Sequence, residues 1–137
     1  MLHLHSTLAI ILLLALIVSI IITFVNFSGN KPYNRKIALL GFITSHLQLL
    51  IGLILFFVLK YPSMISGSIM KDPTMRFKII EHPLTMIIAI VLISIGYIKA
   101  KKLTDAKQAN KTVLIFYILG LILILARIPW GTWSLFA

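Results

Sequence analysis

The chain has 137 residues, of which 60% are hydrophobic, 12% are charged and none is cysteine. A soluble domain of this length buries only about 68% of the surface that its unfolded chain exposes, so it could not hide this much apolar side chain from water. The lack of cysteine excludes disulfides and thiolate metal sites, and three carboxylates spread over two loops disfavour hydrolases that need a carboxylate pair. The net charge of +10 comes from short basic clusters between apolar runs, which argues against a nucleic-acid surface. We therefore predict an all-α polytopic membrane protein.

Four apolar runs have the length that a membrane-spanning helix needs. About 20 residues at a rise of about 1.5 Å cross the roughly 30 Å of hydrocarbon in a bilayer. Backbone groups in lipid must be paired within their own segment, so each run is expected to be a helix. We predict a single domain over residues 1–137, an antiparallel bundle of four transmembrane helices at about 6–27, 37–59, 79–98 and 112–128.

Basic residues set the expected orientation of this bundle. Eight of the thirteen Lys and Arg residues lie in the loops after the first and third helices: Lys31, Arg35, Lys36, Lys99, Lys101, Lys102, Lys107 and Lys111. The positive-inside rule assigns both loops to the cytoplasm. Both termini and the connection between the second and third helices are then outside, and we expect the protein in the inner (cytoplasmic) membrane of a bacterium.

The connection over residues 60–82 carries the signals of a short surface helix that leads into the third span. Asp72 suits the N-cap position of that helix, and Pro73 suits its first turn. Pro83 is then expected to end or kink the lead-in. Only 16 residues run from Pro83 to Ile98, about 24 Å of helix, which is short for a full crossing. We therefore expect Glu81 and His82 at or just inside the hydrocarbon boundary.

Four polar residues fall at similar depth near the outer end of the expected bundle: His5, Glu81, His82 and Arg127. One interpretation is an ion pair of Glu81 with Arg127 beside two interfacial histidines, because charges in membranes must be paired. A second is a ligand site in which the two imidazoles hold a haem iron axially and Arg127 pairs with a haem propionate. A mixed site of histidine and carboxylate for a divalent metal is a third, less favoured interpretation.

His46 stands apart from these residues. It points about 140° away from the small and polar stripe of the second helix, and it lies near mid-membrane, on the order of 15 Å from His82. Both facts argue against His46 and His82 sharing one iron. His46 could face another groove, a partner subunit or a second cofactor, or it could donate a hydrogen bond to a neighbouring carbonyl.

Four segments, taken in order over nearly the whole chain, carry a resemblance: HLHS at 3–6, HLQLLIG at 46–52, EHPLTM at 81–86 and RIPW at 127–130. Together they resemble a family of small bacterial four-helix membrane proteins that are loosely labelled cytochrome-b-like. The resemblance implies haem b as cofactor. It also implies His5 and His82 as axial ligands, His46 and Met86 as reserve ligands, and Arg127 as the propionate partner.

Two functions follow as expectations, and neither requires catalytic activity of the chain itself. The first is a b-type-cytochrome-like electron carrier with haem at the outer side of the membrane. The second is an accessory subunit that packs in the lipid bilayer against a larger respiratory, transport or secretion complex, using its polar stripes and glycine faces as contacts. A small transporter, or a binder of metal or lipid, remains as a third class.

Overall fold

The computed structural model describes residues 2–133. It confirms an all-helical chain with four helices that are each long and apolar enough to cross a membrane. These are α1 (Leu2–Ser28), α2 (Arg35–Val58), a helical run Pro73–Lys101 that contains α4 (His82–Lys101), and α5 (Ala106–Arg127).

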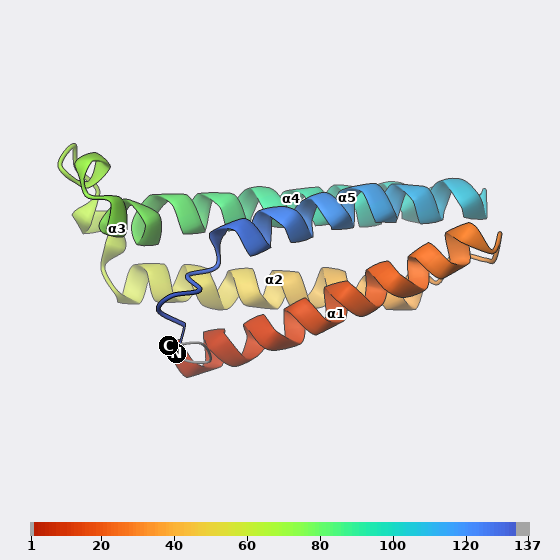
Figure 1. Cartoon of the computed structure of the whole chain (residues 1–137), viewed down its shortest axis with the longest axis horizontal. Coiled ribbons are helices and arrows are strands. Elements are labelled where there is room, and N and C mark those ends of the chain that lie inside the picture. Colours follow the sequence, from red (N-terminus) through yellow and green to blue (C-terminus); the bar gives the residue numbers. More distant parts are fainter. Residues whose placement is uncertain (1, 134–137) are drawn as a thin grey trace.

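The four long helices lie side by side along one axis (Figure 1). The start of α1, the connection after α2 and the end of α5 lie at one end, which we call the histidine end because His5 and His82 are there. The connections 29–34 and 102–105 lie at the other end, which we call the basic end. Both α1 and α4 pack on α2 and on α5. As a result, α1 and α4 lie diagonally across the four-helix core.

Small residues let α4 and α5 approach closely. Ala89, Gly96 and Gly120 are buried, and small residues of this kind mark contacts between helices in membranes. A Cβ atom placed on Gly96 would lie 2.6 Å from Cβ of Phe116, and one on Gly120 would lie 2.8 Å from Cγ1 of Ile93. The two helices are therefore packed almost backbone to backbone, which fixes the depth of the residues at their histidine ends.

The connection between α2 and α4 forms short helical turns: η1 (Tyr61–Met64), η2 (Ile69–Lys71) and α3 (Pro73–Arg76). Asp72 caps α3, because its Oδ1 accepts a hydrogen bond from the backbone N–H of Met75 at 3.3 Å. The cap that the sequence predicts is therefore present.

Of the two outcomes expected at Pro83, an end or a kink, the end is wrong, because the helix continues past this residue. A π-helical turn, η3 (Phe77–Glu81), joins α3 to α4, and the N–H of His82 donates to the carbonyl of Phe77, five residues back. A proline ring clashes with the carbonyl four residues before it in a regular α-helix, and the wider turn just before Pro83 relieves this crowding. The continuous run has 29 residues, about 43 Å, so the expected shortfall of the third span is wrong.

Candidate functional site

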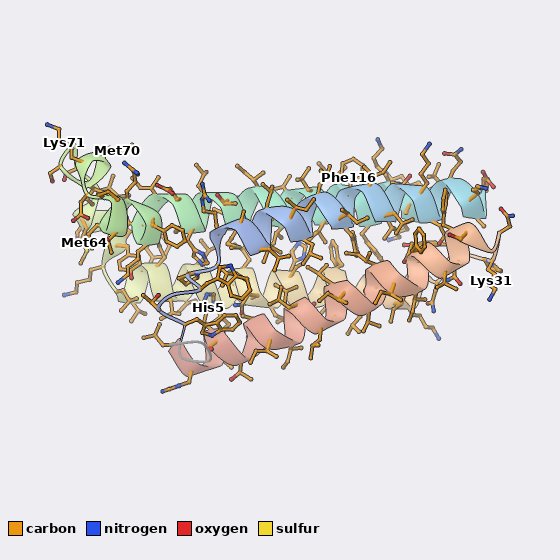
Figure 2. The ribbon with its side chains drawn as sticks, in the orientation of Figure 1. His5, Lys31, Met64, Met70, Lys71 and Phe116 are labelled. Atoms are coloured by element: carbon orange, nitrogen blue, oxygen red, sulfur yellow. The ribbon has the colours of Figure 1, made fainter. Side chains whose placement is uncertain are left out.

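The histidine end brings the rings of His5 and His82 together. Their centroids are 6.4 Å apart and their planes are nearly perpendicular, at 84°. The two residues come from α1 and α4, so the pair bridges the diagonal of the four-helix core. His5 lies close to where the C-terminal segment passes over this end (Figure 2). Facing helices of a bundle commonly build cofactor and metal sites in this way.

His82 is held by the end of α5. Its Nδ1 lies 2.7 Å from the backbone carbonyl oxygen of Arg127, the last residue of that helix. A carbonyl can only accept, so Nδ1 carries the proton and Nε2 keeps its lone pair. The ring of Phe77 stacks on His82 with centroids 6.4 Å apart. This hydrogen bond to a carbonyl is the arrangement that usually orients a metal-ligating histidine.

His5 is held differently, through α2 and the C-terminal segment. The side-chain amide of Gln48 donates from Nε2 to the carbonyl oxygen of His5 at 2.8 Å. The next residue, Ser6, accepts a hydrogen bond from the indole N–H of Trp133. The ring of His5 lies against Gly52, and its Nδ1 is buried without a hydrogen-bond partner among the described residues. The structure of residues 2–133 therefore leaves one buried nitrogen of this imidazole without a hydrogen bond.

Glu81, adjacent to His82, sits between two arginines. Its Oε2 is 2.7 Å from Nε of Arg76, and its Oε1 is 3.6 Å from Nε of Arg127. Arg76 also donates from Nη1 to the carbonyl of Met70 at 2.8 Å. The structure thus brings together Glu81 and Arg127, as the ion-pair interpretation expects. Two guanidinium groups around one carboxylate leave the cluster with a net positive charge.

Arg76 was not among the residues that the sequence predicted for this site. Arg76 precedes Glu81 by five residues, a spacing that does not bring side chains together on an α-helix, where partners are three or four residues apart. The π-helical turn Phe77–Glu81 makes this contact by adding one residue to the turn. The available signal was Pro83, whose crowding of the preceding turn favours such a widening.

His46 belongs to a separate, internal contact. Its Nδ1 is 2.7 Å from the carbonyl oxygen of Phe42 in the same helix, and its Nε2 is 3.1 Å from Oγ of Ser94. Ser94 follows His82 by twelve residues, about 18 Å along α4, so His46 and His82 cannot share one metal ion. Of the alternatives for His46, the structure contains the hydrogen bond to a neighbouring carbonyl. With both nitrogens partnered, His46 is a poor reserve ligand.

The remaining expected ligands contribute less. Met86, one turn after His82, is half-buried and packs against the apolar core. Within residues 2–133, no group of three or more His, Asp or Glu side chains is arranged to hold a metal ion. The mixed histidine and carboxylate site therefore has no support in the described part of the chain. The histidine pair remains as the donor set.

The spacing of the pair suits two axial ligands of one metal. Nitrogen–metal distances of about 2.0–2.1 Å on opposite sides of an ion place the two ring centres about 6 to 6.5 Å apart. The 6.4 Å between His5 and His82 agrees with this value. Neither of two surface hollows, of about 220 and 250 Å³, is lined by His5 or His82, although Phe77, which stacks on His82, lines the first of them. His5 and His82 are therefore the residues that would hold a haem iron, if one is bound.

No protein-family model, no curated protein and no solved structure matches the chain significantly.

Proposed function

We propose that this chain is a b-type-cytochrome-like electron carrier of the membrane, in which His5 and His82 hold the iron of one haem b. The observation that carries the proposal is the 6.4 Å spacing of the two imidazoles across the diagonal between α1 and α4. When bound, haem supplies one-electron redox chemistry, and the protein supplies its ligands, orientation and electrostatics.

The neighbouring side chains have roles in this proposal that follow from their chemistry. The hydrogen bond from His82 Nδ1–H to the Arg127 carbonyl keeps Nε2 unprotonated and increases its basicity as a ligand. Arg76 and Arg127 offer more positive charge than Glu81 neutralises, which favours the propionates of the haem. Phe77, stacked on His82, limits the access of water to the ligand.

The proposal includes an orientation. The four helices form an antiparallel transmembrane bundle with the basic end in the cytoplasm, since eight of the thirteen basic residues lie there. Both termini and the histidine end then face outward from the inner membrane of a bacterium. On this arrangement α3 is the short surface helix of the outer side, and the haem lies near the outer interface.

A spectrum of the purified protein tests the proposal. The protein is extracted in detergent from its native membrane, and a reduced-minus-oxidised visible spectrum is recorded with a pyridine haemochrome assay. We expect stoichiometric b-type absorbance, which His5→Ala and His82→Ala each abolish or shift. His3→Ala is the matched control, because His3 is exposed two residues before His5 on the same helix. Absence of haem from the wild-type protein, or loss of the spectrum only in His46→Ala, contradicts the assignment.

A second candidate is an accessory subunit of a larger respiratory, transport or secretion complex in the lipid bilayer. The observation that favours it is that neither of the two surface hollows, one of which lies at the histidine end, is lined by His5 or His82. In that case Glu81 and the two histidines serve only to hold the helix ends together. Co-purification of stoichiometric partner subunits without a chromophore supports this candidate over the electron carrier.

A further inference from the structure

We propose that Gln48 and Gly52 of α2 are positioning residues that aim the imidazole of His5 at His82. The inference rests on the proposed function, because it names two further residues of the same site. His82 is oriented by a hydrogen bond to its own ring. His5 has a buried Nδ1 with no partner among the described residues, so its ring must be oriented by other means.

Gln48 fixes the backbone of His5. Its side chain is 9% exposed, and its Nε2 donates to the His5 carbonyl at 2.8 Å across 43 positions of sequence. The amide cannot be turned around, because its own oxygen would then face a carbonyl oxygen. The bond joins α2 to the second turn of α1, close to a helix end that otherwise frays easily. Without this bond, no side-chain hydrogen bond to α2 would hold the backbone of His5 among the described residues.

Gly52 provides the space for the ring. It follows Gln48 by four residues, so both lie on the same face of α2. A Cβ placed on Gly52 would lie 3.2 Å from Cε1 of His5 and 3.8 Å from its Nδ1. The imidazole therefore occupies the position of the missing side chain. Any residue larger than glycine would push the ring away from α2 and change its angle to His82.

The two contacts act on different parts of one residue. Gln48 restrains where the His5 backbone lies, and Gly52 determines how closely its ring can approach α2. Together they explain how an imidazole whose Nδ1 has no hydrogen-bond partner within residues 2–133 comes to lie 6.4 Å from a second imidazole on the diagonal helix. This assigns a function to the spacing of Gln48 and Gly52 in the motif of residues 46–52.

A graded set of variants tests the inference. Gly52→Ala displaces the His5 ring by a few tenths of an ångström, and Gly52→Leu fills the space that the ring occupies. Gln48→Glu keeps the shape of the side chain but lacks the donor, and Gln48→Leu removes all polarity. Gly67→Leu is the matched control for glycine, because a Cβ on Gly67 meets nothing within 4 Å. Gln108→Leu, on the exposed side of α5, is the control for glutamine.

Two readouts separate this inference from the proposed function. In the haem-loaded protein we expect the haem affinity to fall roughly 10–100-fold in Gly52→Leu and in both Gln48 variants, less in Gly52→Ala, and not in the controls. The midpoint potential should shift in the same order. In protein without haem, NMR of labelled histidine should show a nuclear Overhauser contact between His5 Hε1 and the α-protons of Gly52, and a second between the two imidazoles.

The outcomes are distinguishable. If wild-type protein binds no haem, the proposed function fails, and the NMR contacts alone decide the positioning role. If the wild-type contacts are absent, the inference is overturned. It is also overturned if the Gln48 and Gly52 variants keep the contact between the two imidazoles together with the wild-type potential, or if Gly67→Leu and Gln108→Leu lower haem affinity by the same factor.

Discussion

Replacing Gly96 by alanine should weaken the packing of α4 on α5. A Cβ at this position would lie 2.6 Å from Cβ of Phe116, whereas two carbon atoms in ordinary contact are about 3.5–4.0 Å apart. The Phe116 Cβ is fixed to the backbone and cannot rotate away, so the helices must separate by about 1 Å. Overpacking costs typically about 1–3 kcal/mol, and the higher helix propensity of alanine offsets about 1 kcal/mol. The difference is a net loss of up to about 2 kcal/mol in the free energy of unfolding, and the short 2.6 Å approach puts the expected loss toward that upper end.

The measurement is unfolding in mixed micelles with increasing SDS, followed by far-ultraviolet circular dichroism. Gly67→Ala is the control, because nothing lies within 4 Å of a Cβ placed there. Phe116, labelled in Figure 2, gives a sharper test. In a Phe116→Gly background, Gly96→Ala should cost little, whereas in a Phe116→Ala background it should cost as much as in the wild type. Equal stability of Gly96→Ala and wild type, or rescue by Phe116→Ala, would refute the reasoning.

Three further predictions concern polar contacts. Glu81→Gln should lower the free energy of unfolding by about 1–2 kcal/mol, because it leaves Arg76 and Arg127 without their shared carboxylate. This loss, measured by SDS unfolding, should be smaller at high salt, which screens the ion pairs. Burial, reinforced by a neighbouring tyrosine, raises the pKa of Tyr33, in the loop at the basic end, to about 12. Since the unfolded residue ionises near pH 10, the contribution of Tyr33 to stability should persist below pH 10 and be lost between pH 10 and 12. Tyr33→Phe should therefore remove the fall in the free energy of unfolding over this pH range. A pH profile unchanged by the substitution would contradict the prediction. Tyr117→Phe should lower the free energy of unfolding by about 0.6 kcal/mol, the typical value for a hydrogen bond between helices in a membrane. The reason is that the buried hydroxyl of Tyr117 donates to a carbonyl of α2 at 2.6 Å. A stability equal to that of the wild type in the same assay would argue against this bond.

The four spans could be predicted because their signal is local. A run of about 20 apolar residues has one favoured structure in lipid, whatever the rest of the chain does. The third span shows where this reasoning fails. Pro83 predicts a break by the steric rule for a regular α-helix, and the chain instead keeps its helix by widening the turn before the proline. Local rules predict the crowding at Pro83 but not which of several relaxations the chain adopts.

The candidate site was predictable only in part. Depth and helical phase bring His5, Glu81, His82 and Arg127 to one end, since these quantities follow from residue counts. The particular contacts of Gln48 with the His5 backbone and of Gly52 with the His5 ring depend on how α1 is placed against α2, and no count of residues gives that placement. For the same reason, the stripe of small and polar residues on α2 predicted a contact with another helix. It did not show that His5 is the residue that α2 contacts there.

The two ends of the molecule are built for different tasks. At the basic end, side chains join helices and loops through bonds to backbone carbonyls: Ser19 to Ile37, Asn110 to Lys31 and Tyr117 to Ala38. Such bonds satisfy their donors and fix the helices to one another. Toward the histidine end, Figure 1 shows α1 inclined away from α4 and α5, with the C-terminal segment crossing between them. There the contacts between helices include the pair of imidazole rings and the bonds of Gln48 and His82 to backbone carbonyls, and Nδ1 of His5 is buried with no hydrogen-bond partner within residues 2–133. On the proposed function, the basic end fixes the helices to one another, and the histidine end keeps the imidazoles of α1 and α4 at the spacing of two ligands of one metal.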